Sequence, residues 1–214
     1  MTVIQTYNID SHIKGPCPKT LDDALSYYMD GYRYSPQYQR RRWDGKIHLL
    51  TCHKTGVVTF PTGLLQTVCD IFAKAKMPYQ IIEQPRPPLQ LFSPALPHKK
   101  LHPYQMNAVV AMIKFKRGVV KVPTAGGKTL IAAAALRALN LPAVYIVHTT
   151  TLLKQTATEF ERVFGADVGI VGMGQSDWRR VTVAMVQTLA RLIETDNVAH
   201  FVDYQALVVD ECHH

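Results

Sequence analysis

One short loop carries the residue types that bind a phosphate group. Residues 122–129 read Val-Pro-Thr-Ala-Gly-Gly-Lys-Thr, between a mostly apolar run at 118–122 and an alanine-rich run at 130–136. Glycines let the backbone approach phosphate oxygens, and the positive end of a following helix attracts the same anion. In such a P-loop, Lys128 reaches the β- and γ-phosphates of a nucleotide and the Thr129 hydroxyl binds Mg²⁺. We therefore predict a buried strand over the first run and a helix over the second.

A second group suited to nucleotide chemistry lies far downstream. The apolar run 206–209 ends in Asp210 and Glu211. An aspartate at this place holds Mg²⁺, and a neighbouring glutamate activates the attacking water. Each pattern alone has a plain alternative, a chance glycine turn or an ordinary polar strand end, but two halves of one Mg-ATP site in the right order favour nucleotide binding. The predicted phosphate-binding residues are Thr124, Ala125, Gly126, Gly127, Lys128 and Thr129; the predicted catalytic residues are Lys128, Asp210 and Glu211; the predicted magnesium ligands are Thr129 and Asp210.

The sequence from residue 101 onward shows the pattern of an α/β fold, in which predicted helices alternate with short apolar strands. The predicted strands cover 118–122, 143–147, 168–171, 181–185 and 206–209, and the predicted helices cover 104–116, the run after the P-loop, 152–164 and 187–193. Parallel strands present their carboxyl ends at one edge of the sheet. That edge is where the P-loop and the acidic strand end are expected to meet.

The first 84 residues predict a small α+β domain. The expected elements are one or two strands within residues 1–16, a helix at 21–29 capped by Thr20, a hairpin turn at Asp44-Gly45 before a strand at 46–50, a helix at 61–76 and a strand at 79–83. Six prolines between residues 85 and 103 exclude a regular helix and indicate an extended linker. The predicted domains are therefore 1–84, a linker at 85–100, and 101–214.

Residues 32–46 are the densest basic and aromatic stretch of the chain. Arginine and lysine side chains suit phosphates, and tyrosine or tryptophan rings stack on bases. The alternative is a solvated basic edge around a small aromatic core, and we expect Trp43 in that core. The residues predicted to contact nucleic acid here are Arg33, Arg40, Arg41, Arg42 and Lys46.

Composition narrows the class of protein. The chain has 214 residues, a formal net charge of +8 and 47% hydrophobic residues, which suits a globular protein with a polyanionic partner. No apolar run is long enough to span a membrane, and the N-terminus lacks a signal-peptide pattern. The four cysteines stand far apart, which indicates reduced thiols, a cytoplasmic setting and no zinc site.

The motifs from residue 102 onward resemble those of superfamily 2 helicases of the DExH type. Asp-Glu-Cys-His at 210–213 is similar to their motif II, and the P-loop resembles their motif I, with Ala125 where that family commonly has glycine. The resemblance implies a RecA-like lobe, the use of ATP with Mg²⁺, and an adenine-reading segment at 102–105 with Tyr104 and Gln105. It also implies two strand-to-helix segments that contact the bound nucleic-acid strand, with contact residues Thr149, Thr150, Gln155, Gln187 and Thr188.

Two segments of the first predicted domain resemble a more specific group within these helicases. Residues 30–34 and 43–50 are similar to the N-terminal domain of the phage UvsW-type recombination helicases. This implies an ATP-dependent DNA helicase that remodels branched or forked DNA in recombination, repair and replication restart. That family needs a second RecA-like lobe, so we expect a fragment that is inactive alone, and a monomer is favoured. Two alternatives remain: a nucleic-acid-binding module with a vestigial P-loop, or the motor of a restriction or remodelling complex.

Overall fold

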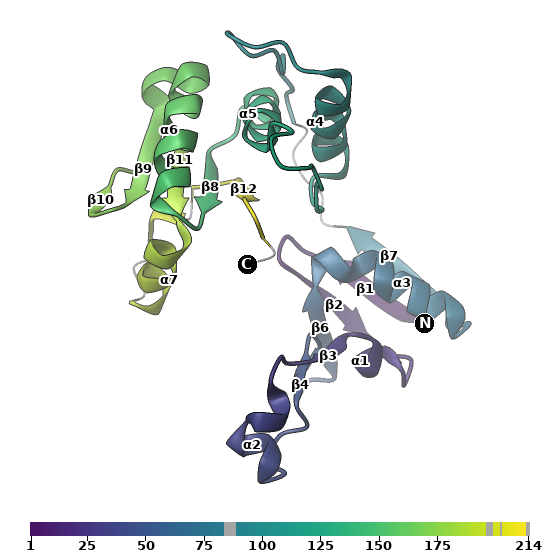
Figure 1. The fold of residues 1–214 in the computed structure, drawn as a ribbon. Helices are drawn as coiled ribbons and strands as arrows, with labels where there is room; N and C mark the ends of the chain where they lie inside the picture. Colours follow the sequence, from purple (N-terminus) through teal and green to yellow (C-terminus); the bar gives the residue numbers. More distant parts are fainter. Residues whose placement is uncertain (84–88, 196–198, 202, 213–214) are drawn as a thin grey trace. The chain divides into compact units, whose positions relative to one another are not determined.

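The structure is a computed structural model that describes residues 1–83, 89–195, 199–201 and 203–212. The chain divides into two compact units, Met1–Pro87 and Pro88–His214, which are described separately (Figure 1). Among the described helices, none is long and apolar enough to cross a bilayer.

The first unit is built on a five-stranded sheet with strand order β5-β6-β2-β1-β7. Its strands are β1 (Thr2–Thr6), β2 (Asp10–Lys14), β5 (Thr51–Cys52), β6 (Val57–Pro61) and β7 (Tyr79–Glu83). The pair β1–β7 is parallel and the other pairs are antiparallel. The 3₁₀ turn η2 (Thr62–Leu64) leads into α3 (Leu65–Lys74), whose Val68 and Phe72 pack on Ile4 and Ile13 of the sheet. The amphipathic pattern of α3 therefore supplies the core of this unit.

The predicted helix at 21–29 is wrong over most of its length. Only α1 (Leu21–Ala24) is helical, Thr20 makes no side-chain cap bond, and β3 (Ser26–Tyr28) follows. The reason is tertiary: β3 pairs antiparallel with β4 (Lys46–His48), and tyrosine favours strands over helices. The first sixteen residues form two strands, β1 and β2, whose turn lies just before Asp10.

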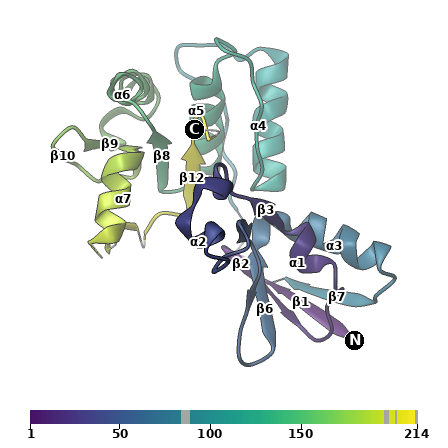
Figure 2. The same cartoon turned by 60° about the horizontal axis from the view of Figure 1, so that its bottom comes forward.

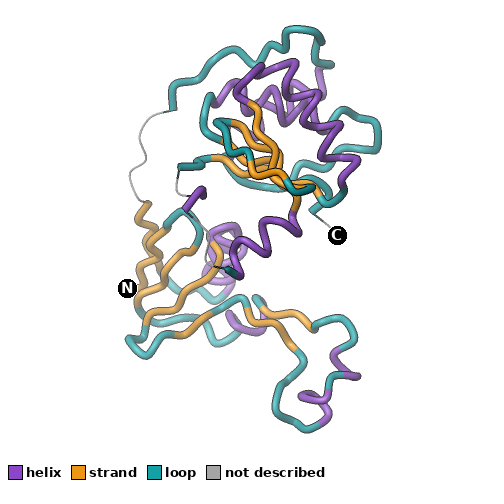
Figure 3. Tube along the Cα trace, turned by 90° about the vertical axis from the view of Figure 1, so that its left-hand side faces the viewer, coloured by secondary structure: helices purple, strands orange, loops and turns teal. Residues whose placement is uncertain are grey.

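The Asp44-Gly45 turn does not join two neighbouring strands directly. Residues 29–45 leave the β3–β4 ribbon as a long excursion with η1 (Tyr32–Tyr34) and α2 (Pro36–Gln39), visible beyond the strands in Figure 3. Gly45 closes this excursion at φ +83°, where a Cβ atom would collide with the Tyr32 ring. The Asp44-Gly45 turn, which predicts a two-residue hairpin, instead ends a seventeen-residue loop.

The second unit is an α/β fold around a mostly parallel sheet with strand order β10-β9-β11-β8-β12. Its strands are β8 (Ala143–Val147), β9 (Val168–Gly172), β10 (Gln175–Ser176), β11 (Val181–Met185) and β12 (Ala206–Val209). Its helices are α4 (Pro103–Phe115), α5 (Lys128–Leu139), α6 (Thr150–Phe164) and α7 (Val186–Glu194), with 3₁₀ turns η3 (Gly165–Asp167) and η4 (Ala199–Phe201). Only β10 runs antiparallel to its neighbour. The predicted α/β class with a parallel sheet is confirmed.

Side chains alternate between the two faces of this sheet. Tyr145 and Val183 pack in one apolar cluster with α5 and α6, whereas Val144 and Ala184 pack in another with Leu189 of α7. Helices α4 and α5 lie side by side in the views of Figures 1 and 2. The sheet is therefore covered on both faces, as its apolar strands require.

The predicted buried strand at 118–122 is wrong in this structure. These residues form no strand, and the side chains of Val119 and Val120 are 83% and 41% exposed. A β-strand needs a hydrogen-bonding neighbour, and within the described residues none pairs with this segment or with the outer edge of β12. β-branched residues alone do not make a strand when no sheet edge receives them.

Candidate nucleotide site and nucleic-acid interface

The P-loop is held by close backbone contacts. The N–H of Gly126 donates to the Pro123 carbonyl at 3.0 Å, and a Cβ atom on Gly126 would meet that carbonyl at 2.9 Å. Gly127 precedes α5 at φ +79°, where a Cβ atom would collide with the Gln105 amide. Both glycines are therefore required by the shape of the loop, and Thr124 and Ala125 form its exposed tip.

Helix α4 supplies the side chains that fix the loop. The Tyr104 hydroxyl and the Gln105 side-chain amide both donate to the Gly126 carbonyl, at 2.9 and 3.0 Å. The Gln105 side-chain oxygen accepts from the N–H of His102 at 2.9 Å and so caps the start of α4. Gln105 is 4% exposed. The two residues predicted to read adenine thus lie at the loop and, in this state, hold its backbone.

Ala125 departs from the ordinary backbone of an L-residue. Its φ is +63°, in the left-handed region that glycine adopts freely. Such a position costs about 1 kcal/mol for alanine. The strain lies where the resembling family commonly carries glycine, a residue that adopts this conformation without strain.

The acidic strand end meets the P-loop directly. The N–H of Asp210 donates to the Ile146 carbonyl at 2.9 Å, which extends the β8–β12 ladder by one residue. Glu211 follows with φ +51°, and its carboxylate accepts a hydrogen bond from the Lys128 ammonium group at the start of α5. This bond, with the charges of both acidic residues, raises the pKa of Lys128. Residues 83 positions apart are thereby brought to one site.

Oxygen ligands suited to Mg²⁺ gather at the same point. Thr129 follows Lys128 in the first turn of α5 and Asp210 precedes Glu211, so the contact between Lys128 and Glu211 brings the Thr129 and Asp210 side chains to the same region. Across the described part of the chain, no cluster of three or more His, Cys, Asp or Glu is present. Mg²⁺ needs no such cluster, because it commonly takes one or two protein oxygens, substrate phosphates and water. The residues present therefore fit a magnesium ion that arrives with a nucleotide.

The predicted backbone-contact residues line the carboxyl edge of the same sheet. Thr149 follows β8, and its side-chain oxygen accepts from the Leu152 N–H at 3.2 Å to cap α6. Gln187 follows β11, and its amide donates to the His148 carbonyl at 3.0 Å, which ties the two strand ends together. Thr150, Gln155 and Gln187 are exposed and Thr188 is half-buried. The five residues therefore lie near the ends of two neighbouring parallel strands.

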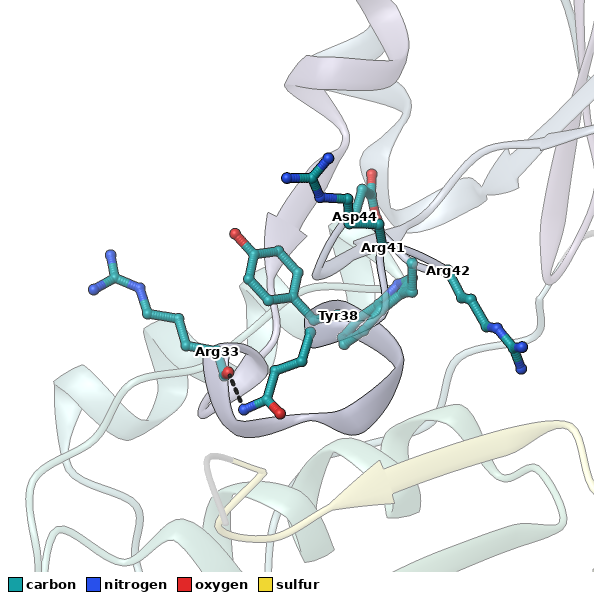
Figure 4. Close-up of a pocket in the computed structure, with 7 residues that line it drawn as sticks. Arg33, Tyr38, Arg41, Arg42 and Asp44 are labelled. Atoms are coloured by element: carbon teal, nitrogen blue, oxygen red, sulfur yellow. Dashed lines mark hydrogen bonds between the residues drawn. The ribbon is translucent and has the colours of Figure 1, made fainter.

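The excursion of the first unit forms a basic hollow of about 610 Å³. Its lining residues are Arg33, Tyr38, Gln39, Arg41, Arg42, Trp43 and Asp44. Figure 4 shows the three guanidinium groups spread around the Tyr38 ring. Gln39 donates to the Arg33 carbonyl at 3.3 Å, the bond drawn in that view.

The hollow keeps its positive charge. Its one carboxylate, Asp44, accepts from the Lys46 N–H at 3.0 Å and lies 2.9 Å from the His48 ring, and these bonds lower the pKa of Asp44. Among the side chains that the structure describes, Arg33, Arg41 and Arg42 form no ion pair with a carboxylate. An anion would therefore meet three guanidinium groups that are not already neutralised.

One sequence expectation for this region, Trp43 in the core, needs correction, and the nucleic-acid contacts of Lys46 and Arg40 stay predictions. Trp43 is half-buried and outside the core cluster; its indole N–H donates to the Lys46 carbonyl at 2.8 Å, and its ring lines the hollow. Lys46 pairs with Asp23 at 2.9 Å, and Arg40 is exposed, but neither lines the hollow. Tyr38 also lines the hollow; the sequence predicts stacking tyrosines in residues 32–46 but does not single out this one.

Comparison with known proteins identifies the family. Residues 98–214, more than half of the chain, match the family described as type III restriction enzyme, res subunit. Residues 13–83 match the family described as DNA helicase UvsW, N-terminal. The chain belongs to the UvsW-like superfamily 2 helicases.

Individual relatives agree with this assignment. The chain is 29% identical to the ATP-dependent DNA helicase uvsW of enterobacteria phage T4, over 95% of this chain and 45% of that protein. It is 30% identical to the DNA 3'-5' translocase XPB2 of Sulfurisphaera tokodaii, over 54% of this chain and 25% of that protein. The chain thus spans less than half the length of both relatives.

Solved structures support the fold. Two crystal structures of the UvsW helicase of bacteriophage T4 align with TM-scores of 0.76 and 0.77 at 23% identity. Each alignment covers 99% of this chain, and they cover 83% and 47% of the respective crystallised chains. The predicted RecA-like helicase fold is confirmed.

Proposed function

We propose that this chain is the nucleotide-binding and DNA-holding part of an ATP-dependent DNA helicase that remodels branched or forked DNA. The observation that carries the proposal is the contact between Lys128 at the P-loop and Glu211 at the end of β12. It puts the phosphate-binding cation and the candidate general base within reach of one γ-phosphate. The printed names of the phage and archaeal relatives, a DNA helicase and a DNA translocase, point to the same activity.

Each residue of the nucleotide site has a proposed role. Backbone N–H groups of Gly126 and Gly127 face the phosphates, and Thr129 and Asp210 hold Mg²⁺, which neutralises charge on the phosphate oxygens. Tyr104 and Gln105 lie on the adenine side. A triphosphate competes with Glu211 for the Lys128 ammonium group. Once Lys128 turns to the phosphates, the Glu211 carboxylate is released to orient and deprotonate the attacking water.

The DNA contacts are proposed on both units. Thr149, Thr150, Gln155, Gln187 and Thr188 offer hydroxyls and amides to backbone phosphates at the carboxyl edge of the sheet. In the first unit, Arg33, Arg41 and Arg42 offer guanidinium groups to phosphates, while Tyr38 and Trp43 offer ring faces to unpaired bases. A forked substrate has both duplex and single strands, which suits such a mixture of contacts.

The domain boundaries follow from this proposal. Residues 1–84 would form the DNA-holding domain, 85–100 the linker and 101–214 the first RecA-like lobe. Translocation by a helicase needs a second lobe that closes on ATP and stabilises the transition state. We therefore expect this chain by itself to bind DNA and nucleotide without separating strands.

The test measures binding and turnover together. We expect Mg-dependent binding of a fluorescent ATP analogue and binding of forked DNA, with steady-state hydrolysis far below that of a complete helicase. Turnover comparable to a complete enzyme would contradict the expected inactivity of the chain alone. If DNA binds and no nucleotide binds at any Mg²⁺ concentration, the binding module with a vestigial P-loop replaces the helicase.

A further inference from the structure

The excursion at residues 29–45 is packed around its own aromatic rings. The Tyr32 ring stacks on Tyr28 with centroids 4.7 Å apart and meets Tyr38 edge-on at 4.9 Å. Gly45 lies so close to the Tyr32 ring that a Cβ atom on it would collide with that ring. Packing of this kind lets the excursion present its other side chains at fixed positions.

Tyr34 is the most exposed aromatic side chain in the part of the chain that the structure describes. It is 85% exposed, whereas Tyr32 and Tyr38 are half-buried. Its backbone is fixed nevertheless, because its N–H donates to the Gly31 carbonyl at 2.9 Å and the N–H of Ser35 donates to the Tyr32 carbonyl at 3.0 Å. Single exposed rings are common on protein surfaces, so the surroundings of Tyr34 must decide what its ring can bind.

Tyr34 lies beside the basic hollow. It directly follows Arg33, whose side chain lines the hollow and whose carbonyl accepts a hydrogen bond from Gln39 of α2 at 3.3 Å. The arginines of the hollow form no ion pair with a carboxylate among the described residues. An exposed ring next to guanidinium groups that are not neutralised fits a polyanion that also carries flat aromatic faces, and nucleic acid has both properties.

We propose that Tyr34 stacks on the terminal base pair of a duplex arm at the branch of forked DNA, while the hollow binds phosphates of the adjoining strand. The inference rests on the proposed function and adds to it the place on the DNA that the excursion recognises. Within a continuous duplex, both faces of each base pair are covered by neighbouring pairs, so a ring can stack only where the duplex ends. A branch is such an end, and the phosphates of the diverging strands lie next to it.

The isolation of the Tyr34 ring favours the end of a duplex over an unpaired strand. Unpaired strands are commonly held by several rings that take successive bases, and Tyr38 and Trp43 in the lining of the hollow suit that role. Tyr34 stands outside that lining as a single exposed ring. One ring offers one stacking contact, which matches the last base pair of a duplex whose separated strand is held in the hollow.

The test is Tyr34→Ala, with forked DNA that carries 2-aminopurine in the base pair at the branch. Wild type should quench the probe by stacking on it. The variant should lose the quenching and bind the fork about 5- to 20-fold more weakly, as for the loss of one stacked base. Its affinity for a circular duplex without ends should stay unchanged, and Tyr34→Phe should restore both quenching and fork affinity. Wild-type quenching and affinity in Tyr34→Ala, or an equal loss of affinity for the circular duplex, would overturn the inference.

A matched control removes another exposed ring. Phe115 at the end of α4 is 66% exposed, and Phe115→Ala should leave fork affinity and quenching unchanged. Equal losses in this control would overturn the inference, because any exposed ring would then serve. If removal of the three arginines of the hollow weakens fork binding and Tyr34→Ala does not, the inference fails and the proposed function stands. If wild type binds no forked DNA, the proposed function fails and the inference fails with it.

Discussion

The nucleotide site and the basic hollow differ in how their charged side chains are paired. At the nucleotide site, the Lys128 ammonium group binds the Glu211 carboxylate. In the hollow, the one carboxylate, Asp44, is occupied by Lys46 and His48, and the arginine side chains around it make no ion pair with a described carboxylate. The lysine of the nucleotide site is paired with a carboxylate of the same site, whereas the arginines of the hollow are paired with no described carboxylate.

This difference predicts different responses to ligand and to salt. A nucleotide must displace an internal partner, so its affinity depends on exchange of hydrogen bonds at short range. A polyanion gains contacts at the hollow without breaking any ion pair, so its affinity depends on counterion release and falls with salt. We therefore expect nucleotide affinity to depend mainly on the exchange of hydrogen bonds and polyanion affinity to depend mainly on charge.

The largest expected effect is that of Lys128→Ala. It removes the cation that faces the phosphates, and we expect Mg-nucleotide affinity to fall about 100-fold, as for loss of strong charge-assisted hydrogen bonds. Binding of forked DNA in the absence of nucleotide should not change, because Lys128 is not among the proposed DNA contacts. Fluorescence titration and DNA anisotropy measure the two. A fall in DNA affinity of similar size would show that Lys128 also contributes to DNA binding, and the two sites would then not act independently.

The next effect is that of replacing Arg33, Arg41 and Arg42 together by alanine. We expect DNA affinity to fall about tenfold or more and the slope of log affinity against log salt to decrease by about 2 to 3, since each phosphate contact contributes about 0.7 to 0.9. A matched control removes three exposed lysines of the same unit, Lys14, Lys19 and Lys54. If the control lowers the slope equally, net charge and not the hollow carries the binding.

A smaller effect should follow Glu211→Gln. The substitution weakens the internal partner of Lys128, so nucleotide affinity should increase about 2- to 5-fold, the range for a partly exposed ion pair. In the complete helicase, hydrolysis should fall at the same time, because the proposed base is gone. Unchanged or weaker nucleotide binding would show that the ion pair does not compete with the phosphates.

The smallest effect concerns the pH dependence of the first unit. The His48 ring donates hydrogen bonds to the carboxylates of Asp22 and Asp44, and these bonds, that to Asp22 first, raise the pKa of His48 above 6.5. A raised pKa in the folded state means that this stabilisation is complete below pH 6.5 and is lost as pH rises through the folded value. Thermal unfolding from pH 6 to 9 should show a mild loss of stability that His48→Gln reduces. The same slope in both proteins would remove His48 as its cause.

Much of the fold could be predicted because its signals are local. The strands at 79–83 and 143–147 are observed with those bounds, since short apolar runs between polar turns leave little choice. The helix after the P-loop and the helix at 104–116 also appear within a few residues of their predicted ends. The run 118–122 has equally apolar residues and yet forms no strand, because the sheet edge it would need is not beside it.

The sequence by itself determined the two chemical motifs, the parallel α/β pattern and the basic character of residues 32–46. These follow from residue type and from periods of two or 3.6, which any segment carries alone. The tertiary structure decided that Lys128 meets Glu211 and that three arginines surround one tyrosine. Such contacts depend on strand order and on how a long excursion returns, and both are set by packing between distant segments.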